Sequence, residues 1–109
     1  MREEVYRDLL AQLLERRGFR VESEKRVRLD IDGLVFRGAL QVDLIVDGLV
    51  VVELKAVERL KPVFFRQVLT YLRALKLPLG ILLNFGDVTL KRGGIHRILN
   101  DYWPDSKTD

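Results

Sequence analysis

Cysteine is absent from the 109 residues, and histidine occurs once, at His96. Without cysteine there can be neither a disulfide nor a thiolate metal site, and one histidine cannot build a multi-histidine zinc site. No apolar run approaches the roughly 20 residues of a membrane span, and the start, Met-Arg-Glu-Glu, lacks the features of a signal peptide. The sequence therefore predicts a cytoplasmic protein with no membrane contact.

Length and composition fit one soluble globular domain over residues 1–109, large enough for a single core without disulfides. The formal net charge of +3 allows a polyanionic partner but does not require one. A nucleic-acid partner is thus compatible with the composition, and only the sequence motifs can indicate whether the chain has one.

Hydrophobic spacing divides the chain into elements in the order α-β-β-β-α-β, which predicts an α/β fold of the mixed-sheet, α+β type. The last strand is expected inside the sheet, buried on both faces and parallel to an earlier strand through the helical crossover. Short edge pieces are expected at Thr89-Leu90 and at residues 95–99, around a Gly93-Gly94 turn, and a polar tail is expected from Asn100. The other expected ranges are a helix over 3–17, a strand over 19–32 with a turn at Asp32-Gly33, a return strand with a bend or bulge at Gly38-Ala39, a strand ending at Lys55, a helix over 62–76 and the strand over 79–85.

The strands on either side of the Asp47-Gly48 turn can pair in two registers. A two-residue loop would place Asp43 opposite Val52 and would put Asp43 and Glu53 on different faces. A loop one residue longer, with Gly48 in a left-handed conformation, would place Val46 opposite Val50 and Asp43 opposite Glu53.

The longer loop is predicted, because it separates the side chains cleanly into two faces. One face would be wholly apolar, and the other would carry all the charges at one end. The apolar set is Val42, Leu44, Val46, Val50, Val52 and Leu54; the mixed set is Gln41, Asp43, Ile45, Val51, Glu53 and Lys55.

Asp43, Glu53 and Lys55 would then share one patch near the rim of an apolar sheet. Buried charges are costly unless they are paired or bind a metal. From spacing alone, a structural ion-pair triad and a metal site explain this patch about equally well.

Three further polar residues border the helical stripes. Glu3 lies beside the buried stripe of the first helix, where its simplest interpretation is an acid that complements the helix dipole. Gln67 and Tyr71 are spaced i, i+4 on the second helix, and spacing alone makes them a polar shoulder with a half-buried tyrosine. Basic residues gather on the first hairpin and are interpreted as a solvated strand face, with a phosphate-tracking surface as the alternative; they are Arg20, Lys25, Arg26, Arg28 and Arg37.

The order of elements, with Asp43 followed by Glu53-x-Lys55, resembles the PD-(D/E)XK nuclease superfamily and its restriction-endonuclease-like core. The resemblance assigns Asp43, Glu53 and Lys55 to the superfamily's motif residues. Gln67 and Tyr71 resemble the Gln-x-x-x-Tyr pattern of its exonuclease-like branches.

Within that superfamily the chain is most similar to the small GxxExxY proteins, over nearly its whole length. The matching stretches are Glu3–Tyr6, Val51–Glu58, Gln67–Leu72 and Leu82–Gly86. The chain departs from the pattern at two places: the glycine and its preceding helix would fall before Met1, and Phe64 stands where relatives often have histidine. A missing helix would leave apolar surface for a second subunit or another partner to cover.

The resemblance implies a magnesium-dependent nuclease, with manganese as a substitute and DNA as the expected substrate. The metal would be held by Asp43, Glu53 and the carbonyl of Leu54. Lys55 would orient the attacking water or neutralise the transition state, Glu3 would act as an outer-sphere acid, and Gln67 would position Lys55 or a phosphate. The alternative is a nuclease-like binding or assembly module with little or no turnover by itself.

Overall fold

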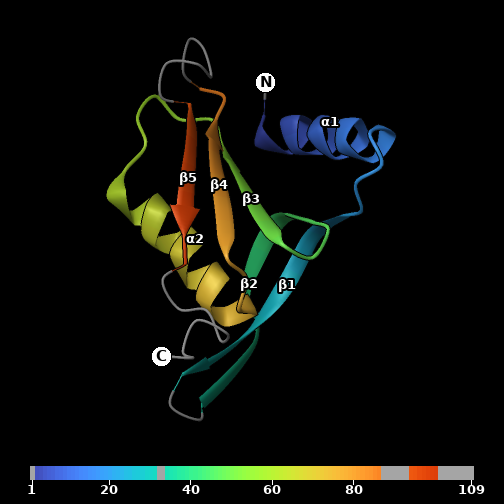
Figure 1. Cartoon of the computed structure of the whole chain (residues 1–109). Coiled ribbons are helices and arrows are strands. Elements are labelled where there is room, and N and C mark those ends of the chain that lie inside the picture. The colour runs from blue at the N-terminus through green and yellow to red at the C-terminus, as the bar shows by residue number, and fades with distance from the viewer. Residues whose placement is uncertain (1, 32–33, 87–93, 101–109) are drawn as a thin grey trace, which may run out of the picture.

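The computed structural model describes residues 2–31, 34–86 and 94–100 and shows a five-stranded mixed sheet with a helix against each face (Figure 1). The strand order is β1-β2-β3-β4-β5, with only the β3–β4 pair parallel. The elements are α1 (Glu3–Arg16), β1 (Val21–Ile31), β2 (Leu34–Val46), β3 (Val50–Lys55), α2 (Pro62–Leu75), β4 (Leu79–Asn84) and β5 (Ile95–Leu99). This order confirms the predicted α-β-β-β-α-β core, the parallel crossover strand and the edge strand at 95–99.

Local sequence explains where the two helices begin and end. Glu3 and Glu4 place negative charge in the first turn of α1, and Pro62 opens α2 at the position where its missing N–H costs nothing. Lys76 ends α2 in a left-handed conformation (φ +58), and Pro78 prevents the helix from continuing.

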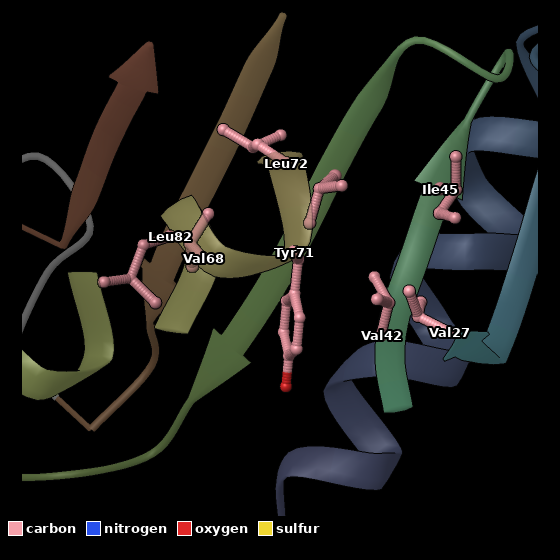
Figure 2. Packing of buried hydrophobic residues seen from close by; sticks show 8 residues of the cluster. Val27, Val42, Ile45, Val68, Tyr71, Leu72 and Leu82 are labelled. Carbon is pink, nitrogen blue, oxygen red and sulfur yellow. The ribbon is translucent and has the colours of Figure 1, made fainter. Parts of the chain in front are cut away.

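The two helices bury different sets of sheet residues. Figure 2 shows α2 packing Val68, Tyr71 and Leu72 against one face of the sheet. On the opposite face, Ala11 of α1 packs with residues of β2, β3 and β4: Leu44, Val46, Val52, Leu54 and Leu83. The predicted separation of Ile45 and Val51 from Leu44, Val46, Val52 and Leu54 is confirmed by these two clusters.

The predicted position of Val42 on the same face as Leu44 and Val46 is wrong. Val42 packs with Val27 and Ile45 in the α2 cluster, so the alternation of β2 breaks between Val42 and Leu44 (Figure 2). The β1–β2 ladder is irregular at the same point, because Glu24, which lies across from Asp43, has a left-handed φ of +54°. Asp43 therefore sits at a twist in the strand pair and not within a regular ladder.

β2 and β3 stay paired over only three positions, from Val46↔Val50 to Leu44↔Val52. Beyond them β3 continues beside β4, while β2 and β1 run together as an arm in a different direction (Figure 1). The β1–β2 register shifts between Val27 and Leu29, opposite Gly38 and Ala39, which confirms the predicted bulge there.

β4 is only partly as predicted, since its two faces are unequally covered. Gly80 and Leu82 are buried beneath α2, whereas Leu79 and Ile81 on the other face keep some exposure. The reason is that α1 packs over β1, β2 and β3 and leaves the β4–β5 end of that face open, where Ile95 is 52% exposed.

The Asp32-Gly33 turn, the Thr89-Leu90 piece, Gly93 and the tail after Asn100 lie outside the described residues. Neither α1 nor α2 has the length and apolar character needed to cross a membrane.

Candidate active site

The hairpin at Asp47-Gly48 adopts the longer register. Asp47 (φ +54°) and Gly48 (φ +65°) are both left-handed, and the N–H of Leu49 donates to the carbonyl of Val46 at 3.0 Å. Val46 nevertheless pairs with Val50, so Leu49 is the extra residue, outside the ladder. Arg20 holds the turn in place, because its N–H donates to Asp47 Oδ1 at 2.8 Å and its carbonyl accepts from the Asp47 N–H at 2.7 Å.

This register brings Asp43 and Glu53 together where β2 and β3 part. In place of ladder hydrogen bonds, the N–H of Asp43 donates to Glu53 Oε1 at 2.8 Å. The N–H of Leu54 in turn donates to Asp43 Oδ2 at 2.9 Å. Each carboxylate thus accepts a hydrogen bond from a backbone N–H that has no strand partner where β2 and β3 diverge. Each carboxylate also has a second oxygen that these bonds do not use.

The backbone of Leu54 faces this site. In an extended strand the N–H and C=O of one residue point to the same side. Because the Leu54 N–H is directed to Asp43, its carbonyl is also on the β2 side of β3, away from the parallel ladder with β4. The carbonyl named as a metal ligand by the resemblance therefore lies on the same side as the two acids.

Burial makes the ionised carboxylate pair unfavourable. It raises the pKa of Glu53 to about 8, and the neighbouring Asp43 charge and a hydrogen bond between the two carboxyl groups act in the same direction. Burial also raises the pKa of Asp43, although the Leu54 N–H and the nearby Arg7 and Lys55 charges oppose this change. At neutral pH the two groups together hold a proton that a cation could replace.

Lys55 lies on the same face, and its Nζ is 4.7 Å from the centre of the Phe64 ring of α2. Its charge favours ionisation of both acids, but within the described residues no ion pair shorter than 4.0 Å joins it to either one. The structural ion-pair triad is therefore not formed. Lys55 instead lines a pocket of about 390 Å³ with Val63, Phe64, Arg66, Gln67 and Thr70.

Tyr71 comes from α2 and is buried, so its description as half-buried was wrong. Burial raises the pKa of its hydroxyl to about 12, with the charges of Glu53 and Asp43 adding to the effect. Gln67 is hydrogen-bonded to the Tyr71 hydroxyl, which links the two residues as their i, i+4 spacing suggested. Tyr71 therefore stays neutral beside the acids at physiological pH.

Glu3 reaches the end of β3 from α1. Its Oε2 accepts a 2.9 Å hydrogen bond from the N–H of Ala56, and its charge opposes ionisation of Asp43. One turn further, Tyr6 stacks on Phe85 with ring centres 4.3 Å apart. The start of α1 is thereby fixed against the ends of β3 and β4, and Glu3 has a role beyond complementing the helix dipole.

Sequence reasoning missed Arg7. This residue is i+4 from Glu3, so it is on the same side of α1, and its guanidinium bridges to Glu24 at 3.2 Å. Glu24 also accepts from Gln41 Nε2 at 3.2 Å, so α1, β1 and β2 are tied together beside Asp43. The i, i+4 relation to Glu3 was the available signal, but only the left-handed turn at Glu24 brings this network to Asp43.

Asn84 was missed as well. It is buried, and its Oδ1 accepts from the N–H groups of Val57 and Gly86 at 3.1 and 3.0 Å. It anchors the connection after Lys55 to the end of β4 and thereby helps to fix the rim on which Lys55 lies.

The donor set suits a hard divalent cation. Two carboxylates and one carbonyl supply only oxygen, which magnesium prefers, and magnesium retains several waters. The described residues hold no cluster of three or more acidic, histidine or cysteine side chains, so backbone and water would have to complete the shell.

A family model described as the PD-(D/E)XK nuclease superfamily matches residues 1–98. The chain belongs to this superfamily. No curated protein and no solved structure gives a significant match. The superfamily's members are usually nucleases that act on nucleic acid with divalent metals, and the mixed sheet with two helices agrees with its restriction-endonuclease-like fold.

Proposed function

We propose that the chain, as a single domain, is a magnesium-dependent nuclease that hydrolyses phosphodiester bonds, with DNA as the expected substrate. The observation that carries the proposal is the reciprocal bonding of Asp43 and Glu53 at the divergence of β2 and β3. A buried pair of acids with raised pKa values favours a cation more strongly than a surface pair would.

Asp43, Glu53 and the Leu54 carbonyl would hold the ion. When bound, magnesium supplies a Lewis acid for a phosphoryl oxygen and lowers the pKa of a bound water. Manganese would serve in its place, because it also accepts an all-oxygen site.

The remaining residues have roles that follow from their contacts. Lys55, between the acids and the pocket of α2, would orient the attacking water or offset charge developing on the phosphate. Gln67 lines the same pocket and holds Tyr71, so it would position Lys55 or a phosphate. Glu3 would remain an outer-sphere acid, since its bond to Ala56 places it beside the site.

The decisive experiment measures cleavage of single- and double-stranded DNA and RNA with magnesium or manganese. We expect Glu53→Gln and Lys55→Met each to reduce the rate by at least about 100-fold, the scale of losing an electrostatic transition-state contact. Glu58→Gln is the matched control, because Glu58 is exposed on the connection after β3 and should keep full activity. Cleavage that persists in the Glu53 and Lys55 variants would come from a contaminant and would overturn the proposal.

The second candidate is a nuclease-like binding or assembly module with little turnover in isolation. It is favoured by the small number of acidic ligands, since among the described residues no third acidic, histidine or cysteine side chain joins Asp43 and Glu53 in a cluster that could hold a metal. Nucleic-acid binding without cleavage in magnesium and in manganese would support this candidate over the enzyme.

Membership in the narrower GxxExxY group is also proposed. Its support is that Glu3 and Tyr6, the two residues matched to that motif, contact the ends of β3 and β4 directly. Because Glu3 and Tyr6 attach α1 to the rim that carries Glu53 and Lys55, there is a structural basis for a sequence motif that combines these residues.

A second copy of the chain is the proposed cover for the open apolar face. Leu10 and Leu14 of α1, with Phe19 after it, line an apolar groove of about 370 Å³ over β2–β5. Leu9 and Leu13 form an exposed ridge on α1. In a two-fold dimer, the ridge of each molecule can pack into the groove of the other. Sedimentation should show a dimer that Leu13→Glu converts to monomer; a monomeric wild-type protein would contradict this.

A further inference from the structure

A second groove, of about 500 Å³, lies between β1 and the C-terminal end of α2. It is lined by five basic side chains and one acidic one: Lys25, Arg26, Arg28, Arg73 and Lys76, with Asp30. Arg73 and Lys76 are more than 40 residues away from the β1 cations in sequence, so only the fold brings the two groups together. From the sequence, only the hairpin cations were visible, and they were interpreted as a solvated face with a phosphate-tracking surface as the alternative.

The groove lies close to the candidate active site along β1. Lys25 pairs with Val42, the residue before Asp43. A ligand held beside Lys25 is therefore one strand away from the twist at which Asp43 meets Glu53.

The groove and the pocket beside Lys55 also follow one another along α2. Arg66 and Thr70 line the pocket beside Lys55, and Arg73 lines the basic groove. Their spacing of i, i+4 and i+7 places all three on one exposed side of the helix. A row of hydrogen-bonding and positive groups thus connects the two cavities.

Helix energetics explain only part of this arrangement. Arg73 and Lys76 complement the negative end of the α2 dipole, as cations near a helix C-terminus do. The dipole gives no reason for β1 to direct Arg28 to the same groove. Lys25 is partly offset by Glu22 at 2.9 Å, so the inference depends chiefly on Arg28, Arg73 and Lys76, whose side chains are exposed.

We infer that this basic groove binds the phosphodiester backbone of one nucleic-acid strand and leads that strand past Arg66 and Thr70 to Asp43 and Glu53. The inference rests on the proposed function and adds the path of the substrate to it. Cations in such a groove follow phosphates without reading bases, so the contact is independent of sequence.

The test is binding of fluorescein-labelled 20-nucleotide single-stranded DNA and RNA to the full chain in EDTA, followed by polarisation at several salt concentrations. Without divalent metal the probe is not cut, so binding is separated from catalysis. The variant is Arg73→Ala/Lys76→Ala. The matched control is Arg16→Ala/Arg17→Ala, which removes the same charge from the exposed end of α1.

We expect the groove variant to bind roughly 10-fold more weakly at 0.1 M salt and to lower the salt slope by about 1.4, two phosphate contacts on a single strand. The control should bind as the wild type does. Equal losses in both variants, or an unchanged slope in the groove variant, would overturn the inference. Comparison of the affinities for DNA and for RNA then shows which backbone the groove prefers.

The outcomes separate this inference from the proposed function. Cleavage by a protein whose groove variant binds normally would refute the groove and leave the nuclease standing. Loss of binding in the groove variant of a protein that cuts nothing would support the groove and remove the nuclease. Arg28→Ala provides a second variant, on β1, if the helix variant fails to fold.

Discussion

The backbone N–H of Asp43 donates to the Glu53 carboxylate at 2.8 Å, so one acid of the pair is held by the main chain of the other. The bond exists because β2 and β3 separate after Leu44 and Val52 and leave this N–H without a strand partner. Neither side chain can rotate away without leaving a backbone group unpaired in a partly buried place, which costs about 1–3 kcal/mol. The pair is thus fixed in position before any cation binds.

The stability of the metal-free protein should fall as pH rises. The folded-state pKa of Glu53, about 8, is above the ordinary value of 4.5, so the folded protein holds an extra proton between these limits. The stabilisation that comes from keeping Glu53 neutral is fully present below about pH 4.5 and is lost by about pH 8. Urea unfolding at pH 5, 6.5 and 8.5 measures it, with Glu53→Gln as reference; a difference between the two proteins that does not change with pH would contradict the account.

Gly80→Ala should destabilise the protein by about 1–3 kcal/mol, the usual cost of overpacking. A Cβ at residue 80 would lie 2.5 Å from Val68 Cγ1 and 3.3 Å from Leu72 Cδ1, because α2 packs closely on β4 at this point. Val68 is β-branched and cannot easily turn aside.

The matched test is a double-mutant cycle with Val68→Ala, which alone should cost about 2–4 kcal/mol through its cavity. The double variant should lose clearly less than the sum of the two. Additive losses in denaturant titrations would show that the contact does not exist.

Removing Arg7 should raise the pKa of Asp43. The Arg7 guanidinium favours the ionised form of that acid and also bridges to Glu24 at 3.2 Å. We expect Arg7→Gln to show a higher Asp43 pKa in a carboxyl-carbon NMR titration. Arg2→Gln is the control, because Arg2 pairs only with the exposed Glu4 among the described ion pairs; an Asp43 pKa that shifts equally in both variants would refute a specific role for Arg7.

Tyr71→Phe should slow cleavage several-fold without moving the limbs of the pH–rate profile. With a pKa of about 12 the hydroxyl, hydrogen-bonded to Gln67 near the acids, does not titrate in the working range. Loss of that bond should cost about 0.5–1.5 kcal/mol of stability. Tyr6→Phe, which keeps its ring stacked on Phe85, is the control for removal of a hydroxyl; a shifted alkaline limb in the Tyr71 variant would mean that the phenol itself titrates.

The sequence was sufficient for the order of elements and for the hairpin register, because Asp47-Gly48 specifies a turn and a slip by one residue would mix the two faces of the strands. It was insufficient for Val42, since the left-handed conformation of Glu24 depends on the strand across from it and on Arg7. Glutamate, unlike aspartate or asparagine, is an uncommon choice for that conformation, and nothing local in the sequence marks it.

The site was predictable to a similar degree. The placement of Asp43, Glu53 and Lys55 on one face follows from the alternation of side chains along two paired strands, which is a local property. Arg7, Asn84 and the convergence of Arg73 with Arg28 depend on how distant elements pack, and helical or strand spacing carries no information about that. The family resemblance added Glu3, Gln67 and Tyr71, whose placement beside the acids spacing alone did not require.

Anomalous scattering from crystals soaked in manganese shows whether a cation binds between Asp43 and Glu53. We expect one peak bounded by the carboxylates of Asp43 and Glu53 and the carbonyl of Leu54, and its loss in Glu53→Gln. Manganese bound elsewhere with that position empty, at a pH above the Glu53 pKa of about 8, would contradict a metal site formed by these residues.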